Sequence, residues 1–554
     1  MLFCFSQLLE FPRRRFSLSV DYEVSMTDPT RPRPLRWIWL LVPCWAVVLL
    51  SLPFPIAESS TFNHDSAYLA RLAENLRAGH GYVNDAHWLV FLDPPSLPMP
   101  YHNANPLYPT LLALTPCDDV LTAARLVSVV GSLLTLASLL VLVARVTDAV
   151  LPRVFVPLAG AIFPPVFVDA MMVLPDALAL GLLLCSAAAL WRVQSAGWAI
   201  LAGMFFGAAW LTRSSVVLAG PACVVYLLTT HGWRSGGVRL LLWATAAMLT
   251  ISPWLWHTAV VWGDPWRSDA AYYLWQDYHA KAFDGSVERY WHSTTPPPPL
   301  RQLAQQEPTA LARFYLTQLF RMPRTLLAHW TEGNYPLAGL LVVLTVWSIW
   351  AGLRRGVVSR KEWLTGLVYL GTVLVALAPR AGSMEIRYVA PLSVLLAVLL
   401  ASGTYLAWMQ VRQAGWINRT TAGLALGLGL LFWLGIVPWQ VVRFAGQLGQ
   451  ANREQAAYLH AVRQAIARTG ADPVVVGHWP YFYAWLSKAP ALSIPDGDDD
   501  LLRQYMKRYQ ARWLLLTRDE LAFWRPHWMG GHWPDWLESP VELDDALLWK
   551  SKDR

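Results

Sequence analysis

The chain has 554 residues, of which 55% are hydrophobic and 13% aromatic, while only 15% are Asp, Glu, Lys or Arg. Soluble chains carry about 25% charged residues. A soluble enzyme of this composition would expose much of its apolar surface to water, and a disordered chain would lack so many large apolar residues. Both classes are excluded. The formal net charge of +7 is small for this length, so the positions of the basic residues say more than their number.

The first 35 residues precede any apolar run that is long enough to cross a membrane. The stretch MLFCFSQLLEFPRRRF is neither a signal peptide nor a spanning helix, because its apolar part is short and comes before the arginines. Met26 is an alternative start. We expect residues 1–35 to form a mobile cytoplasmic extension.

Apolar runs of the length of a membrane-spanning helix, roughly 20 residues, follow along most of the chain. The first covers residues 37–55, and ten more are centred near Leu134, Pro157, Leu182, Phe205, Val224, Ala247, Val343, Val368, Leu396 and Leu430. Backbone groups in lipid must bond internally, so such runs are helices. The sequence predicts an α-helical polytopic membrane protein with about eleven transmembrane helices.

Basic residues in the short connections set the predicted orientation. The loops on the side of the N-terminus hold Arg145, Arg153, Arg192, Arg234, Arg239, Arg354, Arg355, Arg360, Lys361, Arg412 and Arg419. The opposite short loops hold only Arg213, Arg380 and Arg387. By the positive-inside rule the first set is cytoplasmic. The long hydrophilic parts at 58–120, at 263–335 and after about 445 then lie outside, and a membrane module covers 36–445.

The first external part contains a predicted amphipathic helix. Tyr68, Leu69 and Leu72 have helical spacing, with charged residues on the other side. Asn63 or Asp65 is placed to cap its start. The pattern predicts a helix that lies in the membrane interface.

The tail, residues 446–554, alternates short β-like runs with helical ones. PVVVGH and ARWLLLT read as strands, whereas REQAAYLHAVRQAIAR and DDDLLRQYMKRY read as helices. This rhythm predicts a small external α/β domain.

Several stretches together resemble a known family. They are YLARLAENLRAGHGY, NPLYPTLLAL, VLPDALALGLLL, ISPWLWHTAVVWGDP, EIRYVAPLSVLLA and the tail segment VVVGHWPYFYAWLSKAPALSIP. Their order along the chain and their predicted side of the membrane resemble those of the polyprenyl-phosphate-sugar-dependent glycosyltransferases of the C-type fold (GT-C). Protein O-mannosyltransferases and lipid A aminoarabinose transferases belong to this family. Many members carry an Asp-Glu pair in the first motif, whereas this chain has His64-Asp65-Ser66.

Asp65 is the first candidate catalytic residue, because it follows the first span on the external side. A carboxylate there can take the proton of an acceptor hydroxyl as that hydroxyl attacks the anomeric carbon. The alternative is that Asp65 only caps the helix. The resemblance favours the catalytic interpretation, and it implies that a second carboxylate from the next external turn approaches the site. Asp176 and Asp169 flank that turn.

The three external arginines are candidates for binding the lipid-linked phosphate, since guanidinium matches phosphate in charge and geometry. The resemblance places a phosphate contact at Arg387; Arg213 and Arg380 are further candidates, and Glu385 could pair with any of the three. The alternative is that these arginines reach lipid headgroups. His64, Tyr68 and His102 are expected to line the substrate site.

No metal or other cofactor is required by the sequence. A divalent ion held by Asp65 with His64, His102 and His257 is possible, but no spacing predicts coordination. The acidic run at 496–500 is better explained by capping of a helix than by metal binding. The five cysteines lie far apart, without metal-ligand spacing, and no Walker A, GxGxxG or GxSxG motif is present.

The sequence therefore predicts a multi-pass glycosyltransferase of a bacterial inner membrane with its C-terminal domain outside. Its partners would be membrane lipid, a polyprenyl-phosphate-sugar donor and a protein, lipid or glycan acceptor, with no nucleic acid. A secondary transporter or flippase is the first alternative, although no internal repeat is visible. An inactive GT-C-like scaffold is the second, because the Asp-Glu pair is missing.

Overall fold

The computed structural model describes residues 36–51, 63–93, 96–100, 105–146, 150–161, 166–167, 170, 172–192, 195–268, 270–331, 360–383, 392–395, 457–470 and 474–553. Contacts divide the chain into two units, Met1–Leu41 and Val42–Arg554. In the first unit Arg36–Leu40 form the 3-10 helix η1, and the extension expected over 1–35 lies outside the described residues.

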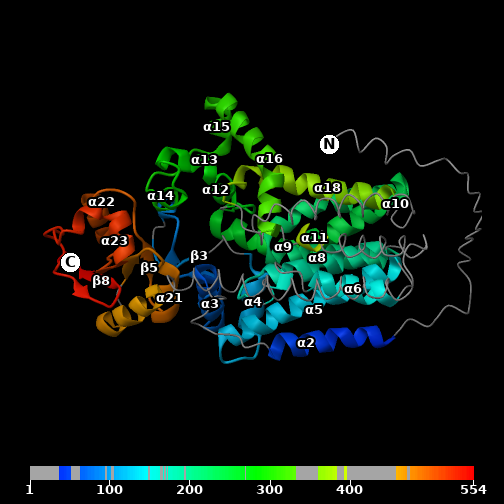
Figure 1. Ribbon diagram of the computed structural model, residues 1–554, viewed down its shortest axis with the longest axis horizontal. Coiled ribbons are helices and arrows are strands. Elements are labelled where there is room, and N and C mark those ends of the chain that lie inside the picture. Colours follow the sequence, from blue (N-terminus) through cyan, green and yellow to red (C-terminus); the bar gives the residue numbers. More distant parts are fainter. Residues whose placement is uncertain are drawn as a thin grey trace, which may run out of the picture. The chain divides into compact units, whose positions relative to one another are not determined.

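Long apolar helices make up most of the second unit. They are α2 (Leu41–Ser51), α5 (Val120–Val146), α6 (Val150–Ala161), α8 (Asp176–Trp191), α9 (Ala196–Thr212), α10 (Gly220–His231), α11 (Trp233–Trp262) and α18 (Arg360–Leu377). Helices α5, α8, α9 and α11 lie side by side (Figure 1), and each packs on the next. Small residues set their spacing, because a Cβ on Gly131 would meet the backbone of Ala177 at 2.5 Å.

Three stretches of helix are long and apolar enough to cross a membrane: Val120–Ala144, Ser214–His231 and Trp233–Trp262. Shorter apolar helices cover Ile38–Leu50, Asp176–Trp191, Ala196–Thr212 and Leu364–Arg380. The spans expected near Val343 and Leu430, and most of the span near Leu396, lie outside the described residues. Helices capable of crossing a membrane are confirmed among the described residues, whereas the number eleven stays a prediction.

The first external part forms α3 (His64–Arg77), the short strands β1 (Val83–Asn84), β2 (Ala86–His87) and β3 (Met99–Pro100), the 3-10 turn η2 (Val90–Leu92) and α4 (Leu107–Leu114). The predicted amphipathic helix is thus confirmed. Its apolar side was expected to face the membrane interface, but Leu69 and Leu72 are fully buried by protein, where α3 packs on α4 and on the C-terminal domain. That domain supplies the apolar surface that lipid was expected to supply.

The second external part is a series of short helices. They are α12 (Ala270–Leu274), α13 (Gln276–His279), η4 (Ala280–Phe283), α14 (Val287–His292), α15 (Leu300–Gln306) and α16 (Pro308–Thr331). Helix α14 lies against η2 of the first external part. The two external parts therefore form one body.

The tail folds as the predicted α/β domain. After a helix over 457–469 come β4 (Val475–Gly477), α21 (Pro480–Ser487), β5 (Ala491–Ser493), α22 (Asp499–Arg508), β6 (Trp513–Thr517), α23 (Arg518–Trp524), η7 (Pro526–Trp528), β7 (Val541–Glu542) and β8 (Ala546–Lys550). The sheet order is β2-β5-β4-β6-β8-β7, with β2, β5, β4 and β6 parallel. Strand β2 comes from the first external part, about 400 residues before its neighbour β5 in the sequence. No pattern in the sequence predicted that β2 joins this sheet.

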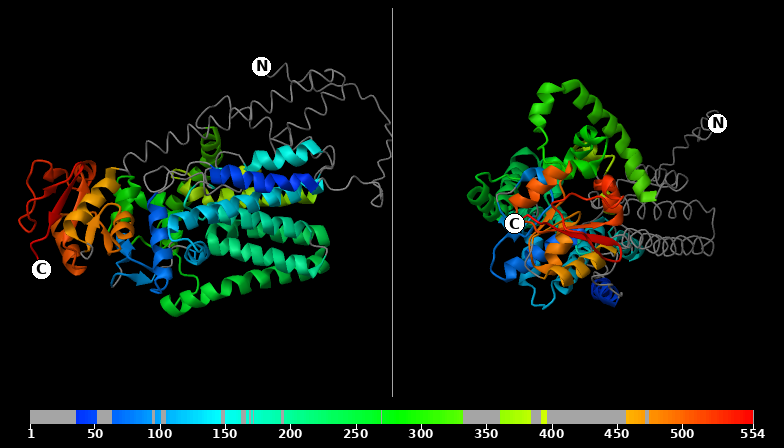
Figure 2. Two further views of the ribbon diagram at one scale, coloured as in Figure 1. Left: turned by 90° about the horizontal axis from the view of Figure 1, so that it is seen from below. Right: turned by 90° about the vertical axis from the view of Figure 1, so that its left-hand side faces the viewer.

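Helix α3 lies between the long helices and the α/β domain. Figure 1 and the left view of Figure 2 place α3 at the end of the long helices that lies beside the α/β domain, and α3 contacts α5 and α21.

Candidate active site

Asp65 lies in the first turn of α3, but it does not cap that helix. Asn63 is the N-cap, and its Oδ1 accepts a hydrogen bond from the Ser66 amide at 2.9 Å. The Asp65 side chain is 21% exposed. Since Asn63 performs the capping, the alternative that Asp65 only caps the helix is wrong. The N-terminus of α3 still favours a negative charge at Asp65.

Asp176 is the first residue of α8, and its carboxylate is fully buried. It forms an ion pair with Arg213, which stands at the C-cap of α9 and is 17% exposed. Each charge complements its own helix, an anion at an N-terminus and a cation at a C-terminus. The pair explains why Arg213 departs from the positive-inside pattern: a buried carboxylate requires a cation at this end of the bundle.

A short turn brings the starts of α3 and α8 together. Ser66 Oγ donates a hydrogen bond to the Val173 carbonyl at 3.0 Å, and Ser128 Oγ donates one to the Met172 carbonyl at 3.0 Å. Both hydroxyls are buried. The turn that leads into Asp176 is therefore fastened to α3 on one side and to α5 on the other.

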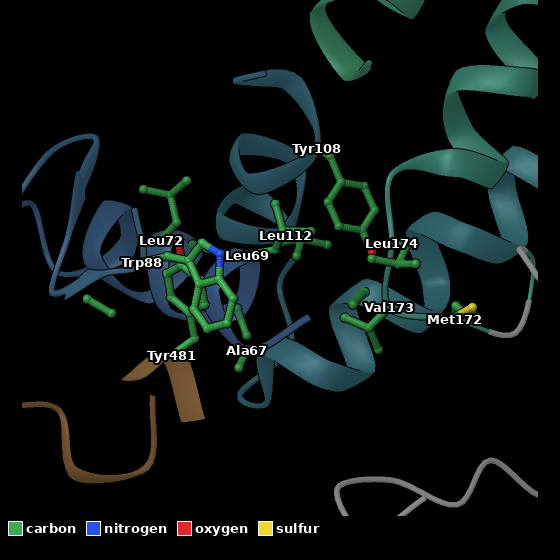
Figure 3. Close-up of a cluster of buried hydrophobic side chains, with 14 of the residues drawn as sticks. Ala67, Leu69, Leu72, Trp88, Tyr108, Leu112, Met172, Val173, Leu174 and Tyr481 are labelled. Atoms are coloured by element: carbon green, nitrogen blue, oxygen red, sulfur yellow. The ribbon is translucent and has the colours of Figure 1, made fainter. Parts of the chain in front are cut away.

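Apolar packing supports the same junction. Figure 3 shows Leu174 beside Tyr108, while Trp88 overlies Tyr481. The rings of Trp88 and Tyr481 stack with centroids 6.2 Å apart. The core under the two aspartates is thus shared by α3, α4, the turn before α8 and the α/β domain.

His64 and Tyr68 are both directed toward the α/β domain. His64 Nε2 lies 3.2 Å from Asp65 Oδ1, and the imidazole ring stands 4.7 Å from the ring of Trp479. Tyr68 packs on Tyr481 at 5.1 Å. Of the residues expected to bind substrate, these two share the region of Asp65.

A second polar cluster lies at the carboxyl edge of the sheet. Glu288 and His292 come from successive turns of α14, and His478 directly follows β4. Glu288 Oε1 is 3.0 Å from His478 Nε2 and 3.8 Å from His292 Nε2. Open α/β sheets bind ligands beyond the carboxyl ends of their strands, so this edge is where a ligand site is expected.

Burial and charge set the protonation of the cluster. Burial lowers the pKa of His292 to about 3, so this ring is neutral. Burial raises the pKa of Glu288, but the hydrogen bond from His478 outweighs burial and holds the pKa below its usual value. The cluster therefore contains an ionised carboxylate beside a neutral buried imidazole.

The three side chains could hold a divalent metal ion, because their ligand atoms lie within 4.8 Å of one another. Carboxylate and imidazole ligands suit zinc. His292 fits, since its Nδ1 faces the Ile494 carbonyl at 2.6 Å and its buried Nε2 has no hydrogen-bond partner in the described part of the chain. His478 fits less well: Trp524 donates to its Nδ1, so Nε2 carries the proton of the neutral ring.

Among the described residues, the metal ligands considered from the sequence form no cluster, and His102 lies outside those residues. His257 stacks on Trp254 within α11, at a centroid distance of 5.1 Å. His64 contacts only Asp65 among them in the described residues. The acidic run is confirmed as a capping element: Asp498 is the N-cap of α22, and Asp499 accepts hydrogen bonds from Trp528 and lies against Arg525.

The second external part is fastened to the turn that follows Arg380. Asp277 accepts hydrogen bonds from the Gly382 amide at 3.0 Å and from the Ser383 hydroxyl at 2.5 Å. Gln276 donates to the same hydroxyl at 2.7 Å. Arg380 itself is buried in the 3-10 turn η5 (Ala378–Arg380), so this guanidinium is held inside the protein.

Four of the predicted site residues, Asp169, His102, Glu385 and Arg387, lie outside the described residues. Reasoning from the sequence also missed Glu288, His292 and His478. The spacing of Glu288 and His292, four apart on a short helix, is a signal for one shared face. Nothing in the sequence links that pair to His478, because only the sheet brings β4 beside α14.

Comparison with known proteins identifies a solved structure of similar fold. No known protein-family profile and no curated protein sequence matches the chain. The crystal structure of ArnT from Cupriavidus metallidurans bound to undecaprenyl phosphate is similar, with a TM-score of 0.54, 15% identity, and coverage of 93% of this chain and 98% of that one. The apo state of ArnT gives a TM-score of 0.43 at 13% identity, with the same coverage. The chain has the fold of ArnT.

Proposed function

We propose that this chain is an integral membrane glycosyltransferase, which moves a sugar from a polyprenyl-phosphate carrier to an acceptor at the outer face of a bacterial inner membrane. The observation that carries the proposal is the Ser66–Val173 hydrogen bond, which links the start of α3, where Asp65 lies, to the turn that precedes the Asp176–Arg213 pair. The fold is shared with a protein crystallised with undecaprenyl phosphate. Sugar and acceptor identity are left open by these residues.

The three charged groups have different roles in this proposal. Asp65, partly exposed on α3, acts as the general base. Arg213, partly exposed at the end of α9, binds the phosphate of the carrier. Asp176 is too buried to receive a substrate proton, so it orients Arg213 and offsets the cost of burying its charge.

The reaction is one displacement. Asp65 takes the proton of the acceptor hydroxyl while that oxygen bonds to the anomeric carbon, and the bond from that carbon to the carrier's phosphate breaks, so that polyprenyl phosphate leaves with the electron pair. The departing phosphate is anionic and is stabilised by Arg213. One displacement without a covalent intermediate inverts the anomeric configuration.

The test compares Asp65→Asn with Asp519→Asn, which removes an acidic group from the first turn of another helix, α23. We expect Asp65→Asn to lower the rate of polyprenyl phosphate release by roughly 10²- to 10⁴-fold, the usual contribution of a general base. Asp519→Asn should leave the rate unchanged. Near-normal release by Asp65→Asn would remove Asp65 from the mechanism, and substrate-dependent uptake into vesicles without release would instead favour a transporter.

A further inference from the structure

The contact between His64 and Asp65 is unusual for neighbours on a helix. Successive side chains on an α-helix point about 100° apart and do not face each other. Nevertheless His64 Nε2 lies 3.2 Å from Asp65 Oδ1. The imidazole must therefore be turned back over the end of α3 by something outside that helix.

Two tryptophans from separate segments hold the ring there. Trp88, just after β2, stacks on His64 at a centroid distance of 5.6 Å and an interplanar angle of 19°. Trp479, at the start of α21, contacts the ring at 4.7 Å. Trp88 is itself buried, and it stacks on Trp479 at 5.2 Å. The orientation of His64 is thus set jointly by α3, the segment after β2 and the α/β domain.

The surroundings also indicate which proton the ring carries. His64 Nδ1 is buried and has no hydrogen-bond partner among the described residues. A proton on Nδ1 would leave a buried donor without an acceptor, which is costly. With the proton on Nε2, that N–H can donate a hydrogen bond to Asp65 Oδ1, which lies 3.2 Å away, and no buried donor is left at Nδ1. The charged groups near the ring are Asp65 on its own helix and Glu288 on α14, with His478 beside Glu288.

We propose that His64 is a positioning residue for Asp65, an inference that rests on the proposed glycosyltransferase activity. Its Nε2–H holds Oδ1 of the carboxylate in place and favours the ionised form, so that Oδ2 takes the proton of the acceptor hydroxyl. His64 keeps its own proton throughout. The residue after Asp65 is Ser66, so no second carboxylate adjoins Asp65 on that side, and His64 is the neighbour that contacts it.

The matched variants separate the hydrogen bond from the packing. His64→Phe keeps an aromatic ring against Trp88 and Trp479 but has no N–H, whereas His64→Gln keeps an N–H donor. His80→Phe is the control, because His80 is an exposed histidine just after α3. The kinetic constants for release of polyprenyl phosphate are measured for each variant across pH.

For His64→Phe we expect kcat to fall on the order of 10- to 100-fold, as for loss of one hydrogen bond to a charged group. KM for the lipid donor should stay unchanged. The acidic limb of the pH–rate profile should move to higher pH, because a carboxylate without its donor is protonated more easily. His64→Gln should recover most of kcat, and His80→Phe should behave like the wild type.

Two results overturn the role of His64: a kcat and pH profile of His64→Phe equal to those of the wild type, or a rise of KM alone, which would mean substrate binding. If His64→Phe does not fold, a loss of kcat in His64→Gln as large as that in Asp65→Asn overturns it as well. Nitrogen-15 spectra of labelled histidine test the contact without turnover, since a ring protonated at Nδ1 contradicts it. A wild type that releases no polyprenyl phosphate from any lipid-linked donor instead refutes the proposed function, and with it this role.

Discussion

The helical module and the α/β domain join distant segments in different ways. In the helical module the contacts between α5, α8, α9 and α11 depend on glycines and on one buried ion pair, Asp176–Arg213. In the α/β domain the strands are joined by backbone hydrogen bonds, and the core is filled by large rings such as Trp528 and Trp549. The difference follows from where the backbone N–H and C=O groups of each element find their hydrogen-bond partners.

Helices form their backbone hydrogen bonds internally, so only side chains decide how closely two helices approach. Strands satisfy theirs with neighbours, so a two-residue segment such as β2 can join the sheet without any side-chain signal. The comparison teaches that charge pairs fix the active region on the helical side, whereas backbone pairing and rings fix it on the side of the sheet.

The largest effect is expected from Arg213→Met, which leaves the Asp176 carboxylate buried without its cation. Removing one partner of a buried pair costs about 3–5 kcal/mol of unfolding free energy. Adding Asp176→Asn should recover part of the loss. The measurement is denaturant unfolding of the purified protein, with Arg234→Met, at an exposed arginine of α11, as the control. Equal stability of the two single variants would contradict the importance of the ion pair.

Gly131→Ala tests the close approach of helices. Its Cβ would meet the backbone of Ala177 at 2.5 Å, so α5 and α8 must move apart, at about 1–3 kcal/mol. Gly366→Ala in α18 is the control, since nothing lies within 4 Å of its Cβ. It should be neutral or slightly stabilising. If the two variants melt at the same temperature, glycine does not set this spacing.

Ser66→Ala tests the link between the starts of α3 and α8. The change removes the hydrogen bond to the Val173 carbonyl, for an expected loss of about 1 kcal/mol. The rate of polyprenyl phosphate release should fall as well, because the turn before Asp176 loosens. Ser252→Ala is the control, at an exposed hydroxyl that bonds only within α11. A fully active Ser66→Ala would show that this hydrogen bond does not position the site.

The last prediction concerns acid stability on the side of the sheet, and its effect appears only at low pH. Burial lowers the pKa of His87 in β2 to about 3, against a charge from Asp93 that raises it. In the unfolded chain His87 takes up a proton near its ordinary value of 6.5, so it favours unfolding progressively as the pH falls from 6.5 toward 3. His87→Phe cannot take up that proton. Its melting temperature should fall less over this pH range than that of the wild type or His80→Phe. Parallel plots of melting temperature against pH for the three proteins would contradict the lowered pKa of His87.

How far the sequence predicted the site depends on the element. Asp65 and Asp176 could be singled out because each is a carboxylate at the start of a helix next to apolar runs. Their connection could not, since it depends on the Ser66–Val173 hydrogen bond across more than a hundred positions. The pairing of Asp176 with Arg213 could not be predicted for the same reason: the sequence indicates Asp176 as a second carboxylate of the site and Arg213 as a separate phosphate contact.

The sequence by itself determined the membrane-spanning class, helix α3 and the α/β domain, because apolar run length, a period of 3.6 and alternating strand and helix signals are local properties. The GT-C resemblance was likewise carried by local motifs. Only the tertiary structure decided that Asn63 caps α3, that β2 joins the C-terminal sheet, and that Glu288, His292 and His478 meet. Those contacts depend on which surfaces pack together, and packing between remote segments leaves no periodic trace in the chain.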